Sequence, residues 1–586
     1  RRLKASPGAA AFEPTLSFRE ASAWYWAGMR QRASEALASL KARYPTARIQ
    51  LGDRQLPLFG TPETALSWLA SAIGTTPAEV RQVATDWTMH RGNATRTLAS
   101  SGGLPLLSHR WAIPVSNFDR VLSEVDSLQQ SFLKQNIVAM PALNPLVVDG
   151  VVIARTAESL LAIDFTNGKR IWQVEEDLRQ VLNQRSAVAA QFAPFDNESV
   201  SNAQVLEQRI WNDLAYGMLS SDGENVYALQ DLSFADMGTR RAQVFLPNGA
   251  IPNNDPAGGN RLQALDLKRQ GALQWEIGGP EMAENDPLSG AFFLGPPLPV
   301  SGSLYCLAEM QGEIRLVCLD SRTGRFLWSQ QLAVVSQNVL VDSSRRLAGV
   351  TPSYADGVLV CPTSSGAVVA VDLTNRSLRW GYRYSRSPRR TNDRMAQLRA
   401  QLSGQNAADA NRHHWCDTTT TIADGRVILT PVMSDELICL RLVDGDVMWK
   451  TDRDDGLYVA GVHQNKVVVI GRNQVVAWKL DSTDIPESAW VMPLPANAIP
   501  SGRGFQSGDT YYLPLSGAVI IALNLKTGRV TGRVKSRDGA LPGNLVSYRG
   551  SIISQAPTAI ECFYEIEPLE KSVKERLASN PQDADA

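Results

Sequence analysis

The residue types best suited to chemistry stand together at 413–417, where the chain reads His413-His414-Trp415-Cys416-Asp417. Imidazole, thiolate and carboxylate groups are the side chains that bind transition metals in proteins. The run leads into an apolar stretch that we expect to form a strand, and neighbouring residues of a strand point to opposite faces. The side chains therefore do not converge on one ion, and we interpret the run as structural or surface residues.

An arginine-rich segment precedes this run. Within 381–414 seven arginines stand against two aspartates, a formal balance of +7 − 2 = +5 with histidine neutral. Guanidinium groups bind carboxylate and phosphate through paired hydrogen bonds. We predict an interaction loop for an acidic protein segment or an anionic polymer, with a solvated loop as the alternative. Its candidate contact residues are Arg386, Arg389, Arg390 and Arg394. The segment lacks interleaved aromatic side chains, which argues against nucleic acid.

Other patterns of catalytic residues are missing. The six cysteines include no adjacent pair and no Cys-x-x-Cys, so we interpret them as small buried residues of strands. No Walker loop or EF-hand loop occurs, and the spacing of the five histidines defines no Ser/His/Asp triad. We therefore predict no catalytic residue, no cofactor-binding residue and no metal ligand.

The elements that must position any site come from a repeated hairpin. Residues 317–328 read VCLDSRTGRFLW, an apolar strand, a polar turn containing Gly324, and a second strand that ends at Trp328. Such a pair of strands around a tight turn is typical of a β-hairpin. Similar stretches occur at 162–172, 264–275, 370–380, 439–449, 477–490 and 522–532. Seven copies of one hairpin predict a repeat architecture.

A second hairpin precedes each copy, often with an Asp-Gly turn such as Asp149-Gly150. Two hairpins make one four-stranded blade, and the closest repeat tryptophans, 41 residues apart, fit a β-propeller blade of roughly 40–50 residues. Three strands without a fourth follow the last copy, while 107–115 reads as a lone strand. We predict that this strand completes an eighth blade and closes the ring. The tryptophans expected to pack between blades are Trp111, Trp172, Trp275, Trp328, Trp380, Trp449 and Trp490.

The predicted protein is mainly β, with a helical N-terminal flank and a short C-terminal helix. Its parts are a helical flank and linker at 1–105, which resembles a helical-repeat remnant, a propeller at 106–566, and a C-terminal helix or linker at 567–586. We expect one helix at 17–43, a second that starts at Thr61-Pro62 and a third that starts at Thr76-Pro77. We also expect a connecting helix at 116–135 that lies against the propeller and a Gly/Ser/Thr linker at 89–106. Because the chain starts Arg1-Arg2-Leu3-Lys4 rather than with Met, we expect a piece of a longer protein.

Three long insertions interrupt the blades, at about 176–215, 231–259 and 381–414. The first and third connect one blade to the next, and the second connects the middle strands of a blade. These connections share one end of the strands in an antiparallel blade. We therefore predict that the insertions cluster on one face, which would be the binding face, with a mere cap over the channel as the alternative.

The hairpin pattern A-x-D-x-x-T-G-x-x-x-W resembles the repeat of the quinoprotein-like, or PQQ-like, eight-bladed propellers. That group includes PQQ-dependent alcohol dehydrogenases and the outer-membrane assembly lipoprotein BamB. The whole layout is similar to that of large PQQ-like repeat proteins of planctomycete-type bacteria. The resemblance covers about 106–566 and implies the fold, but a fold does not fix a function. It also implies an adjacent cysteine pair, a calcium site and a catalytic Asp in the dehydrogenases, and no residue of this chain matches them.

The net charge of −1 favours neither an acidic nor a basic partner. No run of 18 apolar residues is present, so no transmembrane helix is predicted. The resemblance to BamB leads us to a hypothesis: a non-enzymatic scaffold for protein–protein interaction in a bacterial cell envelope, without a cofactor. We expect the protein in the periplasm or cell envelope. Any attachment to a membrane would run through a region outside this sequence. The alternatives are a divergent PQQ-dependent oxidoreductase and a ligand- or glycan-binding sensor domain.

Overall fold

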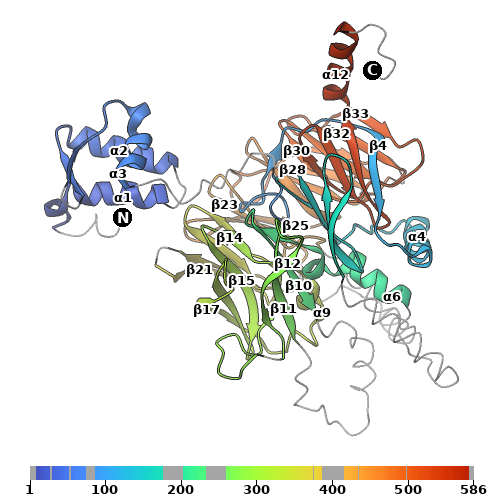
Figure 1. Ribbon diagram of the computed structural model, residues 1–586, viewed down its shortest axis with the longest axis horizontal. Coiled ribbons are helices and arrows are strands. Elements are labelled where there is room, and N and C mark those ends of the chain that lie inside the picture. Colours follow the sequence, from blue (N-terminus) through green and yellow to red (C-terminus); the bar gives the residue numbers. More distant parts are fainter. Residues whose placement is uncertain are drawn as a thin grey trace. The chain divides into compact units, whose positions relative to one another are not determined.

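The computed structural model divides the chain into two compact units, Arg1–Val83 and Ala84–Ala586 (Figure 1). The residues that it describes are 8–26, 30–51, 54–73, 86–175, 202–231, 259–280, 282–373, 375–385, 415–432, 434–496 and 498–579. Among them, no helix is both long enough and apolar enough to cross a membrane.

The N-terminal unit is a small helical bundle with a β-hairpin. Its elements are η2 Ala9–Phe12, α1 Thr15–Trp26, α2 Arg30–Arg43, β1 Arg48–Leu51, β2 Arg54–Pro57, η3 Pro62–Thr64 and α3 Ala65–Ile73. The prediction of one helix at 17–43 is wrong, because α1 and α2 are separate helices that pack side by side. The apolar stripe runs through both helices since both face one core, where Phe18, Leu37 and Leu69 are buried. The helix expected near residue 76 lies outside the described residues.

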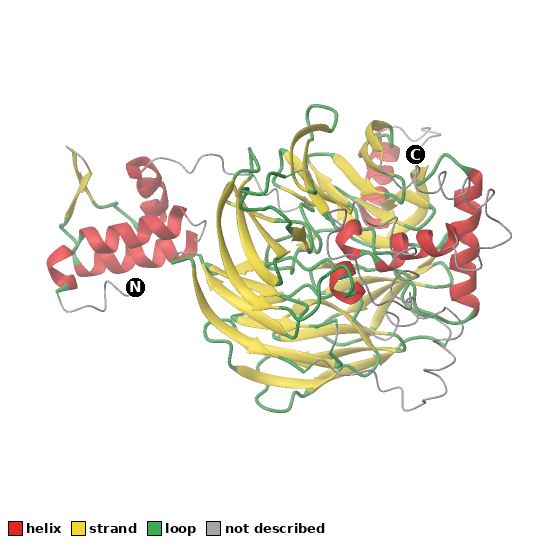
Figure 2. Ribbon diagram, turned by 90° about the horizontal axis from the view of Figure 1, so that it is seen from below, coloured by secondary structure: helices red, strands yellow, loops and turns green. Residues whose placement is uncertain are grey.

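The second unit is an eight-bladed β-propeller, as predicted (Figure 2). Blade 1 has strands β5 Leu146–Val148, β6 Val151–Arg155, β7 Ser159–Asp164 and β8 Arg170–Glu175. Blade 2 has β9 Ser220–Ser221, β10 Asn225–Asp231, β11 Asn260–Asp266 and β12 Ala272–Gly278. Blade 3 has β13 Phe292–Phe293, β14 Leu298–Val300, β15 Ser303–Met310, β16 Glu313–Asp320 and β17 Phe326–Val334. Blade 4 has β18 Ser353–Ala355, β19 Val358–Pro362, β20 Ala367–Asp372 and β21 Ser377–Arg383.

The other four blades follow the same order. Blade 5 has β22 Thr421–Ala423, β23 Arg426–Leu429, β24 Glu436–Arg441 and β25 Val447–Asp452. Blade 6 has β26 Gly456–His463, β27 Lys466–Gly471, β28 Gln474–Lys479 and β29 Ser488–Pro493. Blade 7 has β30 Phe505–Ser507, β31 Thr510–Leu515, β32 Val519–Asn524 and β33 Val530–Lys535, and β3 Ala99–Ser100 pairs with β30. Blade 8 has β34 Asn544–Tyr548, β35 Ser551–Gln555, β36 Ala559–Glu565 and β4 Pro105–Pro114.

The first strand of each blade lies at the centre of the ring. First strands of neighbouring blades contact one another along most of the ring, and β34 of blade 8 contacts β5 of blade 1. The outer strand of blade 8 is the N-terminal strand β4, in which Trp111 lies opposite Cys562 of β36. Blade 8 therefore combines strands from both ends of the propeller sequence, and the ring has no open edge between the first and last blades.

The repeat tryptophans occupy equivalent positions on the outer strands. Each lies opposite an Ala or Cys of the third strand, at a shift of the strand register. Five indole nitrogens donate to a carbonyl in the third-to-fourth-strand turn of the next blade; these are Trp111, Trp275, Trp380, Trp449 and Trp490. Each of these five tryptophans thus joins its own blade to the following one.

Blade 7 is the exception, because Gly532 stands where the tryptophan is expected, opposite Ala522. The next blade, blade 8, has no turn between its third and fourth strands, since its fourth strand comes from the N-terminal side. An indole at this position would have no turn to cover. Leu104 lies there instead, and a Cβ added to Gly532 would be 3.3 Å from Leu104 Cδ2.

Helices cover the face where one blade connects to the next. They are α4 Asp119–Lys134, α6 Asn202–Glu207, η4 Gln208–Asn212, α7 Leu214–Gly217 and α9 Ser343–Leu347. As predicted, α4 connects the last blade to the first, and Val125 and Phe132 pack in one cluster with Leu143 and Trp211. The C-terminal helix α12 Ile566–Ser579 follows β36 and buries no residue.

The strand order assigns the three insertions as predicted: two connect neighbouring blades and one connects β10 with β11. Most of their length lies outside the described residues, at 176–201, 232–258 and 386–414. The clustering of the insertions on one face therefore stays a prediction.

Candidate functional site

The centre of the ring contains a stretch of the chain that the sequence suggested was a linker. Residues 86–104, here called the channel segment, follow the inner strands from blade to blade. Trp87 pairs with Val147 of β5 through two backbone hydrogen bonds of 2.8 and 3.1 Å. The Thr88 carbonyl accepts from Ser221 N of blade 2 at 2.7 Å.

The same pattern continues around the ring. The Ala94 carbonyl accepts from Tyr354 N of blade 4 at 2.8 Å, and the Thr95 carbonyl accepts from Ile422 N of blade 5 at 3.0 Å. β3 pairs in parallel with β30 of blade 7, and Trp87 Nε1 donates to the Ser547 carbonyl of blade 8 at 2.9 Å. The channel segment therefore bonds to the innermost strands of six blades. Its contacts lie near the first hairpin turns, so it occupies that end of the channel.

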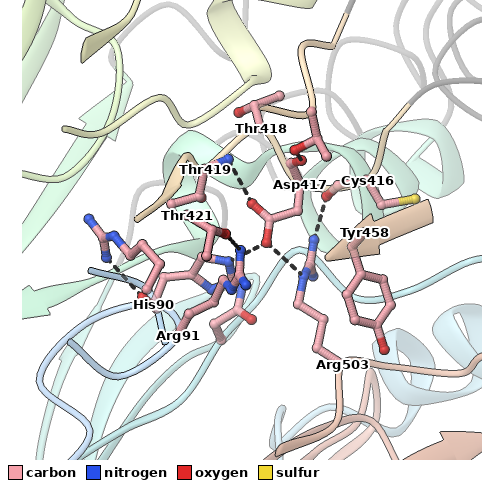
Figure 3. A network of polar contacts seen from close by, with 12 residues as sticks. His90, Arg91, Cys416, Asp417, Thr418, Thr419, Thr421, Tyr458 and Arg503 are labelled. Carbon is pink, nitrogen blue, oxygen red and sulfur yellow. Dashed lines mark hydrogen bonds and ion pairs between the residues drawn. The ribbon is translucent and has the colours of Figure 1, made fainter. Parts of the chain in front are cut away.

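Asp417 is the centre of the buried polar contacts in the channel, and only 2% of it is exposed (Figure 3). Its Oδ2 lies 2.9 Å from His90 Nε2 and 3.7 Å from Arg503 Nε, and its Oδ1 accepts from Thr419 N at 2.9 Å. Burial acts to raise the pKa of Asp417, but His90, Arg503 and Arg91 together outweigh it and hold that pKa well below its usual range. Asp417 is therefore a carboxylate at neutral pH.

His90 is neutral at the same pH. Burial lowers the pKa of His90 to about 4, although Asp417 acts in the opposite direction. A neutral imidazole next to a carboxylate carries its proton on the facing nitrogen, so Nε2 donates to Asp417. His90 therefore provides a hydrogen bond to Asp417 without a compensating charge.

Three guanidinium groups surround this pair. Arg503 donates to the carbonyls of Pro141 and Cys416. Arg96 donates to the carbonyls of His90, at 2.8 Å, and Pro352, at 3.0 Å. Burial lowers the pKa of Arg96 to about 9, which still leaves it charged at neutral pH.

The third guanidinium, Arg91, donates to Thr421 Oγ1 at 2.8 Å. Three nitrogens of these side chains are buried without a hydrogen-bond partner among the described residues: Arg91 Nη2, Arg96 Nε and Arg503 Nε.

Two buried tyrosines lie near Arg503. The Arg503 guanidinium lies 5.8 Å from the ring centre of Tyr458. The hydroxyls of Tyr458 and Tyr511 are 3.4 Å apart, a long distance for a hydrogen bond between hydroxyls. Both rings are buried. Their hydroxyls therefore have capacity for a further polar partner.

The other end of the channel opens into a recess on the face of the blade-to-blade links. The empty space of the recess is about 820 Å³, a volume that includes open solvent at its mouth. Its walls include Met140, Trp211, Leu347 and Trp415. Arg503 also lines it. Arg503 is thus the group that connects the recess with the buried cluster around Asp417.

The structure places the predicted residues in different environments. Arg386, Arg389, Arg390, Arg394, His413 and His414 lie outside the described residues. Cys416 and Asp417 follow this gap, and Asp417 lies in the channel rather than on the surface. The six cysteines are free thiols, and five of them are buried.

The sequence analysis missed the residues that the channel segment contributes, namely His90, Arg91 and Arg96. Their contacts join residues more than 250 positions apart in the chain. The signal that could have identified them is that these three ionisable side chains stand in a stretch rich in Gly, Ser and Thr, at 89–106.

The cluster does not fit the calcium site that the resemblance implies for quinoprotein dehydrogenases. Calcium takes six to eight oxygen ligands, mostly carboxylates and carbonyls. The cluster offers one carboxylate among three guanidinium groups, and the described part of the chain has no group of three His, Cys, Asp or Glu placed to hold a metal ion. No step through a calcium-bound quinone follows from this geometry.

Comparisons with known proteins agree with the fold. Residues 257–411 and 402–540 match a family model described as outer membrane protein assembly factor BamB. The chain matches no curated protein. Similar solved structures include BamB from Moraxella catarrhalis, with a TM-score of 0.41 and 13% identity over 72% of this chain and 96% of that chain. Another is the quinohemoprotein alcohol dehydrogenase from Comamonas testosteroni, with a TM-score of 0.47 and 10% identity over 82% of this chain and 80% of that chain.

The matched region, 257–540, begins before β11 of blade 2 and ends after β33 of blade 7. Outside it, blades 1 and 8 continue the same strand order and the same tryptophan contacts. The second unit is therefore an eight-bladed propeller, and its residues 257–540 match the family model described as outer membrane protein assembly factor BamB.

Proposed function

We propose that the propeller is a non-enzymatic scaffold that binds other proteins in a bacterial cell envelope, in the manner suggested by its BamB-like repeats. The observation that carries the proposal is the channel segment, whose main chain bonds to the innermost strands of five blades and whose Trp87 side chain bonds to that of a sixth. The chain's own residues thus occupy one end of the central channel. The opposite face, where the blade-to-blade links lie, remains for partners.

The face of the blade-to-blade links is the proposed binding face. It carries the recess and the attachment points of two long insertions. The proposed contacts are Arg386, Arg389, Arg390 and Arg394, and the proposed partner is an acidic segment of an envelope protein, since paired guanidinium hydrogen bonds suit carboxylates. The protein itself would act in the periplasm or at the envelope.

A charge-reversal experiment tests this proposal. Replacing the four arginines by Glu should abolish capture of acidic envelope proteins by the immobilised chain, and capture by the original chain should weaken with salt. The matched control reverses four exposed basic residues in turns between third and fourth strands, at Lys169, Arg322, Arg325 and Arg529. Equal capture by both variants and the original chain would contradict the proposal.

The oxidoreductase alternative has its own test. A ligand present at 100 times its Kd stabilises a protein by about 2.7 kcal/mol. We expect no such stabilisation by PQQ with Ca²⁺ in thermal unfolding. A reproducible shift of that order, together with dye reduction in the presence of an alcohol, would favour the oxidoreductase.

A further inference from the structure

The channel cluster contains more positive than negative charge. Its described ionisable groups are Arg91, Arg96 and Arg503 against Asp417, a balance of +3 − 1 = +2 with His90 neutral. The exposed fraction is 2% for Arg96, 6% for Arg503 and 2% for Asp417, whereas Arg91 is partly exposed with its Nη2 atom buried. A buried charge without an opposite charge is strongly unfavourable, so such clusters are normally neutralised.

Neutral acceptors satisfy only part of this cluster. The guanidinium groups donate to backbone carbonyls and to hydroxyls, yet Arg91 Nη2, Arg96 Nε and Arg503 Nε have no hydrogen-bond partner among the described residues. Water molecules at these nitrogens would supply acceptors but would leave the two excess charges in place. An anion supplies acceptors and charge together.

We infer that the channel binds one small oxyanion, a carboxylate or a phosphate, between Arg91 and Arg503 and beside the hydroxyl of Tyr458. Figure 3 shows Arg91 and Arg503 around Asp417, and the Arg503 guanidinium lies 5.8 Å from the ring centre of Tyr458, whereas Arg96 donates to the Pro352 carbonyl. The Tyr458 hydroxyl is suited to donate to the anion, because its contact with the Gly502 carbonyl is long at 3.4 Å.

The route to this site runs through the recess. The channel segment occupies the opposite end of the channel, and Arg503 lines both the recess and the buried cluster. The recess walls are mixed, with Met140 and Trp211 beside Glu207 and Asn212. Because Arg503 and Asp417 lie in a buried cluster, the site suits a compact oxyanion more than a large polyanion.

This inference is independent of the scaffold proposal, because partner capture is proposed for the arginines at 386–394 and the anion for those of the channel. The test uses the full chain, dialysed against sodium chloride, whose anion is not an oxyanion and serves as the background. Inorganic phosphate and acetate are titrated separately by calorimetry at constant ionic strength. Native mass spectrometry of the dialysed protein detects any anion that stays bound.

We expect one phosphate or one acetate per chain and a higher melting temperature with the better ligand. Arg91→Gln should raise the Kd at least tenfold, and Tyr458→Phe should raise it several-fold while keeping the ring in place. The matched control is Tyr305→Phe, which removes a tyrosine hydroxyl in blade 3 and should leave the Kd unchanged. Tyr458→Phe also guards against a folding defect in Arg91→Gln.

Two results would overturn the inference. One is the absence of both stoichiometric binding in the titrations and a retained anion in the native mass spectrum. The other is binding whose Kd does not change in Arg91→Gln and Tyr458→Phe, since that anion would lie elsewhere.

Discussion

The indole of Trp111 lies directly on Gly168, so closely that a Cβ added to the glycine would be 2.6 Å from Trp111 Cγ. Trp111 Nε1 also donates to the Phe165 carbonyl in the same turn, at 2.9 Å. Trp111 belongs to the outer strand of blade 8 and Gly168 to the turn of blade 1. The contact therefore joins the two ends of the ring, and φ at Gly168 is +71°, which leaves no other residue well suited to the position.

The first prediction separates this contact from backbone strain. Gly168→Ala and Gly150→Ala both place alanine at a positive φ, +71° and +78°, but an added Cβ meets nothing within 4 Å at Gly150. Both variants should lose about 1–2 kcal/mol from the left-handed conformation, and Gly168→Ala should lose about 1–3 kcal/mol more from overpacking against Trp111. Urea unfolding measures the difference. Equal losses would contradict the role of the contact.

The second prediction concerns ring closure by β4. Replacing residues 106–115 with a Gly/Ser linker of equal length removes the outer strand of blade 8 and exposes the edge of β36. The melting temperature of the propeller should fall sharply and aggregation should increase. As a control, deletion of residues 1–83 removes a separate compact unit and should leave the propeller transition in place. An unchanged melting temperature after the linker replacement would show that closure does not require β4.

The third prediction concerns the pH dependence that His90 causes. Its pKa is about 4 in the folded chain and close to 6.5 when unfolded, so the unfolded chain binds more protons between these values. Stability should therefore fall as the pH decreases from 6.5 to 4, by at most about 1.4 kcal/mol per pH unit from this group. His90→Gln keeps an amide donor for Asp417 and should flatten the slope in this window.

His463→Gln is the control for this experiment, because His463 pairs with the half-exposed Asp509 outside the channel cluster. The measurement is the urea midpoint at pH 4.5, 5.5 and 6.5. If the slope persists in His90→Gln and disappears in His463→Gln, the pH dependence comes from His463 and the prediction for His90 is wrong.

Most of the fold could be predicted from the sequence, but only part of the candidate site could. The hairpin ending at Trp328 repeats often enough to predict eight blades, and the unpaired strand around Trp111 predicts the closure of the ring. These signals are local, because each hairpin forms within about a dozen residues. The pair His90–Asp417 spans 327 positions, and no periodicity marks it. Residues 86–104 read as a linker because they pair with the inner strands mainly through backbone groups, which leave no side-chain pattern.

The same limit explains the N-terminal helices. Phe18 and Leu37 fall on one helical stripe, yet they belong to two helices that face a common core. A stripe identifies the buried side of a helix, but it does not show where the chain reverses.

The last prediction concerns Asp417 as the one carboxylate of the channel cluster. Asp417→Asn keeps the size of the side chain and removes its charge, so the three guanidinium groups lose their opposite charge in the described cluster. Removing one partner of a buried ion pair costs about 3–5 kcal/mol, and we expect a loss of that order in urea unfolding. The control is Asp435→Asn, which breaks a surface pair with Arg453 at 3.2 Å and should cost no more than about 1 kcal/mol. If the channel also holds an anion, phosphate or acetate should stabilise Asp417→Asn more than the original chain, because the variant has one more positive charge to neutralise. Equal stabilities of Asp417→Asn and Asp435→Asn would show that the cluster does not depend on this carboxylate.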